Sequence, residues 1–305
     1  MVQWIKFWIL ALIWGSSFLL IKVAVGDLGA FPLVSIRLGL AALIFFAFLQ
    51  WTGRKLPATR REMAALIFVG VFNTAVPFAL ISWGETKIDS GLATILNATV
   101  PLFNLIFAHF ILSDERLNLF KIIGLGVGFL GVIILMSRGL SDTDNPVVGQ
   151  FAVIGGAICY AVSVVVIRLH LRRLDPFVTA GWSLVFGAIA IISATLIFIH
   201  PLPNLGEMEA KVLLAAVTLA VINTVVAYFL FYDLIDKWGV RATLVTYAMP
   251  PIGVTLGFVV LGEHIDWRLI VGGLMIVTGI VAAKLNGLPP FAILRGRAIA
   301  RKSAS

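Results

Sequence analysis

The chain has 305 residues, of which 60% are hydrophobic and only 12% are charged, and its formal net charge is +8. Its mean hydropathy is +1.05. Soluble domains are about half apolar and a quarter charged, so this composition excludes a water-soluble globule of this length and predicts a protein solvated by lipid. The basic residues lie between apolar runs and near the C-terminus, which is typical of membrane topology, and we expect no nucleic-acid partner.

The N-terminal segment is the first long apolar run. Residues 1–26 carry one early basic residue, Lys6, but the run is too long for the hydrophobic region of a signal peptide, and no A-x-A cleavage site follows it. We interpret it as a retained membrane span. The single cysteine, Cys159, excludes an intrachain disulfide and is interpreted as a small buried hydrophobe.

Ten apolar runs are each long enough to cross a bilayer as a helix, which needs about 20 residues. Backbone groups in lipid must be hydrogen-bonded within the segment, and this favours helices. We therefore predict an all-α integral membrane protein with ten transmembrane helices. The expected spans are 4–25, 31–51, 63–83, 90–112, 118–137, 148–168, 177–199, 210–232, 240–261 and 267–285.

Lysine and arginine set the expected orientation. With the N-terminus in the cytoplasm, 17 of the 23 Lys and Arg residues fall on the cytoplasmic side, in agreement with the positive-inside rule. We therefore expect a multi-pass protein of the cell (inner) membrane with both termini cytoplasmic. Tryptophans near span ends, such as Trp4, Trp51 and Trp238, fit the aromatic belt at the membrane surface.

Two Asn-Thr pairs interrupt apolar runs at corresponding places in the two halves of the chain. The stretch VFNTAVPFAL contains Asn73, and VINTVVAYFL contains Asn223, 150 residues later. A glutamate-glycine-glycine pattern with intervals of nine and seven residues also recurs near the end of each half. Its two occurrences are Glu115–Gly124–Gly131 and Glu263–Gly272–Gly279. The shared order of these features indicates an internal repeat.

Each half holds five spans, and an odd number means that the second half enters the membrane from the opposite side. The prediction is therefore two inverted five-helix repeats, which are characteristic of secondary transporters that bind substrate near the membrane midplane. The polar stretch RGLSDTDNPVVG, near the middle of the chain, predicts a linker. We divide the chain into a first repeat, a linker, a second repeat and a basic cytoplasmic tail, with boundaries 1–140, 141–147, 148–287 and 288–305.

The chain resembles the EamA family of the drug/metabolite transporter superfamily over nearly all of residues 4–285. The resemblance is carried by ALIWGSSF in the first span, by Pro32 and Arg37 in the second, and by the two glutamate-glycine-glycine patterns. It implies ten spans, a central cavity and, usually, export of amino acids or other small metabolites. In the second half Gly181 takes the Arg37 position, so we expect an asymmetric cavity.

Polar and aromatic residues inside the spans are the candidates for the substrate pathway. The ring of Trp14 can stack on a substrate, and Tyr160 stands at the equivalent place in the second half. Prolines at 101, 250 and 251 each leave a carbonyl four residues earlier without its helical partner, which favours a cavity or a neighbouring helix at those carbonyls. The candidates are Trp14, Ser17, Asn73, Asn97, Tyr160, Ser163, Asn223, Tyr228, Thr246 and Tyr247.

Asn73 and Asn223 lie about midway along the third and eighth spans. An asparagine without partners in hydrocarbon is costly, so both side chains should face protein or water. Two interpretations stay open. Each asparagine ties two helices together by a hydrogen bond, or the pair lines opposite walls of one cavity and binds substrate.

Arg37 and His109 are the ionisable groups placed inside the spans, and such groups are costly and often functional. Arg37 lies about two turns into its span, from which its guanidinium can also snorkel to the membrane surface. His109 is the candidate for proton coupling, with a satisfied histidine at the membrane surface as the alternative. No span carries a central Asp or Glu, so proton-driven and facilitated movement both stay open.

These features predict a secondary transporter that exports small metabolites, amino acids or related compounds, across the inner membrane by alternating access. The competing hypothesis is an integral-membrane enzyme acting on lipids, which needs a polar catalytic cluster. The stretch GEHID, residues 262–266, offers too few metal ligands and is interpreted as a helix hairpin. We expect no enzyme activity and no cofactor. The expected partners are a small-molecule substrate and membrane lipids, in a monomer or a homodimer, and Gly124 with Gly128 predicts helix packing within the chain.

Overall fold

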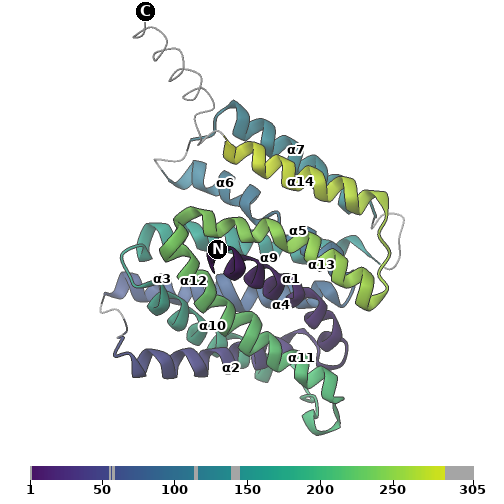
Figure 1. The fold of residues 1–305 in the computed structure, drawn as a ribbon. Helices are drawn as coiled ribbons and strands as arrows, with labels where there is room; N and C mark the ends of the chain where they lie inside the picture. The colour runs from purple at the N-terminus through teal and green to yellow at the C-terminus, as the bar shows by residue number, and fades with distance from the viewer. Residues whose placement is uncertain (1, 55, 57–58, 113–115, 139–144, 286–305) are drawn as a thin grey trace, which may run out of the picture.

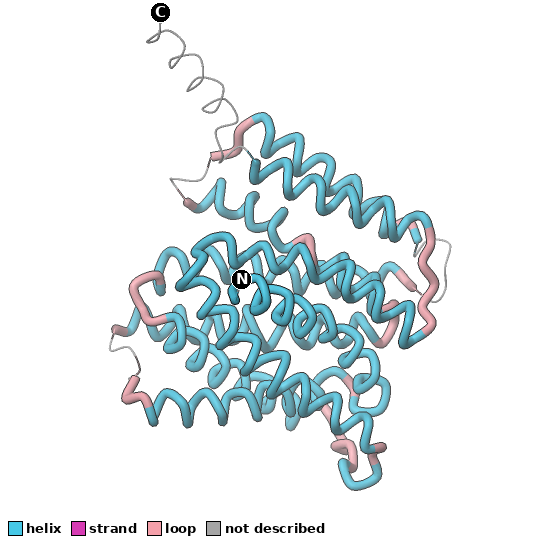
Figure 2. The backbone as a smooth tube through the Cα atoms, in the orientation of Figure 1, coloured by secondary structure: helices cyan, strands magenta, loops and turns pink. Residues whose placement is uncertain are grey.

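Figure 1 shows the computed structural model of the chain, which describes residues 2–54, 56, 59–112, 116–138 and 145–285. Glu115, residues 141–144 of the predicted linker and the predicted tail at 288–305 lie outside the described residues. Helices joined by short loops make up the described chain, which contains no strand (Figure 2).

The helices follow one another closely along the chain. The α-helices are α1 (Val2–Leu28), α2 (Ala30–Trp51), α3 (Arg60–Gly70), α4 (Val76–Glu85), α5 (Ser90–Asn97), α6 (Val100–Ile111), α7 (Leu119–Met136), α9 (Val147–Val166), α10 (Pro176–Phe198), α11 (Ala210–Ala220), α12 (Ala227–Trp238), α13 (Val245–Leu261) and α14 (Trp267–Leu285). The π-helical segments are η1 (Val71–Ala75), η2 (Ile167–Leu171) and η4 (Val221–Val226), and the 3₁₀ segments are η3 (Leu205–Glu207) and η5 (Gly239–Leu244).

Nine helical stretches of the described chain are long and apolar enough to cross a membrane, and Trp267–Ala283 is a shorter apolar helix. Three of the nine contain a π-helical segment: α3, η1 and α4 form Arg60–Glu85, α9 and η2 form Val147–Leu171, and α11, η4 and α12 form Ala210–Trp238. With α14 as the tenth helix, the predicted all-α membrane fold is confirmed. The observed spans differ from the expected ones by a few residues at their ends.

Two interruptions in the helices follow from single residues. Gly29 alone separates α1 from α2, and its φ of 74° lies in the left-handed region that favours glycine. Pro101 has no N–H to donate to the carbonyl of Asn97, and its ring opposes a continuous helix at that point. Accordingly α5 ends at Asn97 and α6 begins at Val100, so the fourth span is a broken helix.

The glycines of the repeated pattern bring α7 and α14 together, side by side along one edge of the bundle (Figure 1). A Cβ on Gly131 would lie 2.6 Å from the carbonyl oxygen of Gly272, and a Cβ on Gly272 would lie 2.8 Å from that of Gly131. Gly124 meets Gly279 in the same way. The repeat equates Gly124 with Gly272 and Gly131 with Gly279, so each contact maps onto the other when the halves are exchanged. This packing fits the inverted repeat.

Other helices also pack across the two halves: α2 against α10, α1 against α11 and α13, and α4 against α9. Buried aliphatic side chains from both halves form the main core, among them Leu33, Leu92, Leu96, Val153 and Leu219. Because successive spans alternate in direction, the loops before α5, before α9 and before α14 gather at one end of the bundle. We call it the loop end, and we call the opposite end, where α1 begins, the terminal end.

Candidate functional site

Both Asn-Thr pairs lie inside π-helical segments. Asn73 and Thr74 belong to η1, and Asn223 and Thr224 belong to η4. The threonine hydroxyls donate to carbonyls of the preceding helical turn, Thr74 to Gly70 at 2.5 Å and Thr224 to Leu219 at 2.9 Å. π-Helical turns are rare and are frequent at functional sites. The sequence analysis did not predict them, and the repeated pair was the only signal of their place.

The two asparagines differ in their contacts. The Asn223 side chain is buried and its Nδ2 donates to the Ile13 carbonyl and to the hydroxyls of Ser17 at 3.0 Å and Ser16 at 3.2 Å, all on α1. Asn73 is half-buried, and the described residues give its side chain no hydrogen bond. Asn223 therefore joins η4 to α1, whereas Asn73 has no such tie to a neighbouring helix.

Arg37 on α2 is buried, with 7% of its surface exposed. Its Nε donates to Thr224 Oγ1 at 3.0 Å, and its guanidinium carbon lies 4.0 Å from the centre of the Phe78 ring. The side chain therefore points into the protein, and of the two directions open to it in the sequence, the outward one is not adopted. No Asp or Glu of the described residues lies within ion-pair distance of it.

Tyrosines from the second half surround this arginine. Tyr160 and Tyr228 interact with it electrostatically, and the Glu85 carboxylate interacts with it more weakly. Both side chains are half-buried and make no hydrogen bond with the described residues. The Tyr160 ring lies 6.4 Å from that of Phe78, edge to face. We call Arg37, Phe78, Tyr160, Thr224 and Tyr228 the Arg37 centre. It unites two predicted pathway residues, Tyr160 and Tyr228, with three that the prediction left out.

The other predicted pathway residues do not belong to the Arg37 centre, and several have partners of their own. Trp14 packs on Phe231, with ring centres 5.0 Å apart. Ser163 is buried and donates to the Cys159 carbonyl at 2.9 Å, and Ser17 receives the hydrogen bond from Asn223.

Asn97, Thr246 and Tyr247 lie beside the proline-containing segments. The Asn97 Oδ1 is buried and has no donor among the described residues. Thr246 donates to the Thr243 carbonyl at 2.9 Å. Tyr247 lines a groove of about 970 Å³ whose other walls include Trp4, Trp8 and Trp238. This groove is mostly apolar.

His109 lies in the last turn of α6, at the terminal end. Its Nδ1 accepts a hydrogen bond from the Leu117 amide at 3.2 Å, which connects α6 to the segment before α7. A histidine that accepts a backbone hydrogen bond near a helix end has a structural role there. Proton coupling by His109 stays a prediction.

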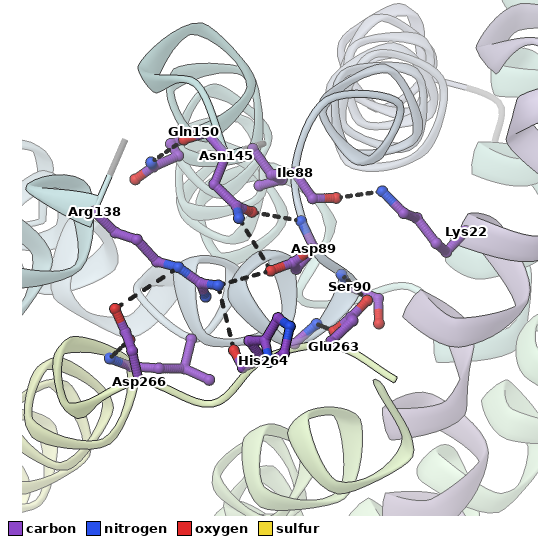
Figure 3. Close-up of polar contacts among 12 residues, drawn as sticks. Lys22, Ile88, Asp89, Ser90, Arg138, Asn145, Gln150, Glu263, His264 and Asp266 are labelled. Atoms are coloured by element: carbon purple, nitrogen blue, oxygen red, sulfur yellow. Dashed lines mark hydrogen bonds and ion pairs between the residues drawn. The ribbon is translucent and has the colours of Figure 1, made fainter. Parts of the chain in front are cut away.

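At the loop end, polar side chains from three loops and from α1 form one cluster, shown in Figure 3. Arg138 donates to Asp89 at 3.0 Å and to the His264 carbonyl at 3.2 Å, and it lies 3.8 Å from Asp266. The Arg138 side chain is 7% exposed. We call Lys22, Asp89, Arg138, Asn145, Glu263 and Asp266 the loop network.

The start of α5 is the centre of the loop network. Asp89 stands at the N-cap position, but its carboxylate does not cap the helix. Instead Glu263 accepts hydrogen bonds from the amides of Ser90 at 2.7 Å and Gly91 at 2.9 Å. A helix N-terminus leaves these amides without partners and favours a negative charge, so Glu263 replaces the local cap.

Asn145 and Lys22 complete the loop network. Asn145 accepts from the Asp89 amide at 2.8 Å and donates to the Asp89 carboxylate at 3.0 Å. Lys22 donates to the carbonyls of Glu85 and Ile88, at 2.8 and 2.7 Å. Burial raises the pKa of the Asp89 carboxyl above its ordinary value, against the Asn145 hydrogen bond and the charge of Arg138, which lower it.

A pocket of about 560 Å³ lies among the residues of the loop network. The sequence analysis interpreted residues 262–266 as a hairpin, and they do join α13 to α14. In the described part of the chain no three His, Cys, Asp or Glu residues are grouped to hold a metal ion. The sequence analysis missed the network because its members come from segments far apart in the chain. It also missed Glu85, whose carboxylate is buried at the end of α4 with no partner among the described residues.

The apolar helices, their symmetric packing and the Arg37 centre define a multi-pass membrane protein built from two inverted repeats. The chain belongs to the EamA-like transporter family, whose model matches residues 4–137 and 147–284. It is therefore a membrane transporter of the drug/metabolite type and not an enzyme.

Curated relatives resemble the chain over most of its length. The uncharacterized transporter YoaV of Bacillus subtilis (strain 168) is 22% identical over 88% of this chain and 92% of its own. The uncharacterized inner membrane transporter YedA of Escherichia coli (strain K12) is 27% identical over 85% of this chain and 83% of its own. A solved crystal structure shares the fold, with a TM-score of 0.64 and 21% identity, over 94% of this chain and 99% of its own.

Proposed function

We propose that this protein is a secondary transporter that exports small metabolites, amino acids or related compounds, across the inner membrane by alternating access. The loop network is the observation that supports the proposal best, because contacts between the two halves close one end of the bundle there. Hydrogen bonds and ion pairs between loops can separate while the helices stay intact, so this end can open by a movement of one half against the other.

The terminal end has its own contacts between the halves. Lys6 pairs with Asp233 at 2.7 Å, and Arg54 pairs with Asp175 at 3.4 Å. These four side chains are 29–41% exposed, and exposed ion pairs contribute only about 0–1 kcal/mol. In an inverted repeat the two ends are alternative gates around one substrate site. We call the Lys6–Asp233 and Arg54–Asp175 pairs the terminal gate. We infer that the terminal gate opens while the loop network stays formed.

Reconstitution tests the proposed function directly. Purified protein in liposomes should carry at least one radiolabelled amino acid or related metabolite in a saturable way, with and without an imposed pH gradient. Flux equal to that of protein-free liposomes for the whole panel would contradict the proposal. Flux that ignores the pH gradient would support facilitated movement, and full proton-driven flux in His109→Ala would exclude His109 as the proton carrier.

A reactive thiol in the fourth span can test whether the loop network closes the loop end to water. In a Cys159→Ser background, we place a thiol at Asn97, which lies seven residues into its span from the loop end. Replacing Arg138 with Met should increase about tenfold the rate at which this thiol reacts with a water-soluble reagent. A tenfold change corresponds to a shift of about 1.4 kcal/mol in the equilibrium between the closed and open loop end. The exposed Arg172→Met is the matched control. An unchanged rate in the Arg138 variant would exclude the loop network as a gate.

The basic residues predict that the terminal end lies in the cytoplasm. In the same background, a cysteine at the exposed Asn204, at the loop end, should react with an impermeant reagent added outside intact cells. A cysteine at the exposed Thr59, at the terminal end, should react only after permeabilisation. The opposite pattern would reverse the orientation.

A further inference from the structure

We propose that the Arg37 centre binds the carboxylate of a small metabolite, with Arg37 as its ionic partner and the hydroxyls of Tyr160 and Tyr228 as further donors. The inference deepens the proposed function, because it assigns a chemical class to the substrate and a position to its charged group.

Arg37 is a buried cation with no Asp or Glu of the described residues within ion-pair distance, and the Glu85 carboxylate acts on it only from farther away. Of the five N–H donors of a guanidinium, only the one on Nε has an acceptor in the described chain, the hydroxyl of Thr224. The four donors on the terminal nitrogens have none. An unpaired charge in the membrane interior is costly, and such residues mark binding sites and ion pathways. A ligand with a negative charge would satisfy both the charge and the free donors.

The geometry around the guanidinium favours a planar monoanion. Phe78 covers one face of the guanidinium at 4.0 Å, and Thr224 holds its Nε edge, so the terminal nitrogens remain for a ligand. A planar fork of two nitrogens matches a carboxylate with two parallel hydrogen bonds. One cation balances one negative charge, whereas a phosphate dianion would leave a second charge without a partner in a low-dielectric site.

The hydroxyls of Tyr160 and Tyr228 complete the donor set. Both interact electrostatically with Arg37, the Tyr160 ring lies 6.4 Å from the Phe78 ring that covers the guanidinium, and both hydroxyls lack hydrogen bonds with the described residues. A phenol in an apolar environment usually has a hydrogen-bond partner, so two free ones beside one arginine also indicate a missing acceptor.

The repeat does not supply a second centre of this kind. Gly181 stands at the Arg37 position of the second half, and a Cβ on it would lie 2.7 Å from Leu49 Cδ1. No long side chain fits there without displacement of Leu49. One carboxylate per chain is therefore the expected stoichiometry.

Binding to the purified full-length protein tests the inference. The probes are L-amino acids and small monocarboxylates, each compared with its primary amide, together with inorganic phosphate and a sugar phosphate. We expect at least one carboxylate to bind and to raise the melting temperature, and its amide to bind at least tenfold more weakly. Arg37→Gln should abolish the ligand-induced shift, Arg37→Lys should keep part of it, and Tyr228→Phe should weaken binding severalfold.

The matched control is Arg172→Gln. Arg172 is exposed after η2 and belongs neither to the contacts that close the two ends nor to the Arg37 centre. Its loss should leave ligand affinity unchanged. A structural role for Arg37 predicts a lower melting temperature of the ligand-free Arg37→Gln protein with an unchanged ligand shift, and this result would overturn the inference.

Three other results would also overturn it: no probe binds, the amides bind as well as the acids, or phosphates bind in preference to carboxylates. If Arg37→Gln does not fold, Arg37→Lys and Tyr228→Phe still decide, because wild-type affinity in both would exclude the site. Carboxylate binding that depends on Arg37, without transport in liposomes, would support this inference and contradict the proposed function. Transport that is indifferent to Arg37 would do the reverse.

Discussion

Glu263, in the loop after α13, accepts hydrogen bonds from the backbone amides of Ser90 and Gly91, 173 and 172 residues earlier in the chain. The contact joins the second half of the protein to the first at the N-terminus of α5. A charged acceptor at this place is favoured by both the free amides and the helix dipole.

The first prediction concerns this contact. Glu263→Gln keeps the shape of the side chain but loses its charge and one of its two acceptors. Hydrogen bonds to charged groups contribute about 1.5–3 kcal/mol, so the free energy of unfolding should fall by roughly that amount. Thermal unfolding in detergent measures it. The control is Glu207→Gln, at an exposed carboxylate in the loop before α11. Equal melting temperatures for the two variants would contradict the capping role of Glu263.

The second prediction is a pH dependence at Asp89. Because burial raises its pKa, the folded protein holds the proton more tightly than the unfolded chain does. The corresponding stability is present below the ordinary Asp pKa of about 3.9 and is lost as the pH rises through the raised pKa. Wild-type protein should therefore lose stability relative to Asp89→Asn from about pH 4 upward, until the raised pKa is passed. Asp236→Asn, at an exposed carboxylate, is the control.

Melting temperatures of wild type and Asp89→Asn between pH 4 and pH 8 measure this dependence. A difference that grows in favour of the wild type with rising pH would show that the Arg138 ion pair outweighs the burial of Asp89.

The third prediction separates the two repeated asparagines. Asn223→Ala removes a buried donor that joins η4 to α1, whereas Asn73 has no hydrogen bond to lose among the described residues. Hydrogen bonds between membrane helices contribute about 0.6 kcal/mol on average and at most about 1.7 kcal/mol. Asn223→Ala should therefore lower the melting temperature of the ligand-free protein and Asn73→Ala should not. Equal losses would refute the difference between them, and a raised KM in Asn73→Ala alone would support substrate contact by Asn73.

The fourth prediction compares two glycines of α7. A Cβ on Gly131 would meet the backbone of α14 at 2.6 Å, whereas the exposed Gly126 has nothing within 4 Å. Gly131→Ala should push the two helices apart and cost about 1–3 kcal/mol. Gly126→Ala should be neutral or stabilising by up to about 1 kcal/mol, because alanine is the better helix former. Unfolding of both variants in detergent checks this, and a neutral Gly131→Ala would mean that α7 and α14 do not pack closely.

Sequence alone predicted the parts of this protein that depend on the bilayer and on local pattern. Bilayer thickness sets the length of an apolar run, so the ten helices could be marked without knowing their neighbours. The spacing of Gly124 and Gly131, repeated in Gly272 and Gly279, indicated the inverted halves because each repeat needs the same small residues where its helix meets its partner. The break at Pro101 likewise depends on one residue and its own helix.

Identical residues nevertheless acquired different environments once the halves packed together. Asn73 and Asn223 are each followed by a threonine in an apolar run, but η4 packs on α1 and η1 packs on α9. On α1 the hydroxyls of Ser16 and Ser17 receive Asn223. The pattern that equates Trp14 with Tyr160 puts Val162 at the place of Ser16 on α9, so one of the two hydroxyls has no counterpart there, and Ser163, at the place of Ser17, donates to the Cys159 carbonyl and has no hydrogen bond with Asn73.

The Arg37 centre and the loop network were decided by tertiary structure. Arg37 meets Thr224 across 187 residues, and Arg138 joins loops that precede α5 and α14. The sequence determined that Arg37 lies within a span, but both inward and outward directions are open to a long side chain there. Packing chose the inward direction, because η4 brings a hydroxyl and α4 brings the Phe78 ring to the same place. Such contacts depend on how whole helices lie against one another, and no local pattern records that arrangement.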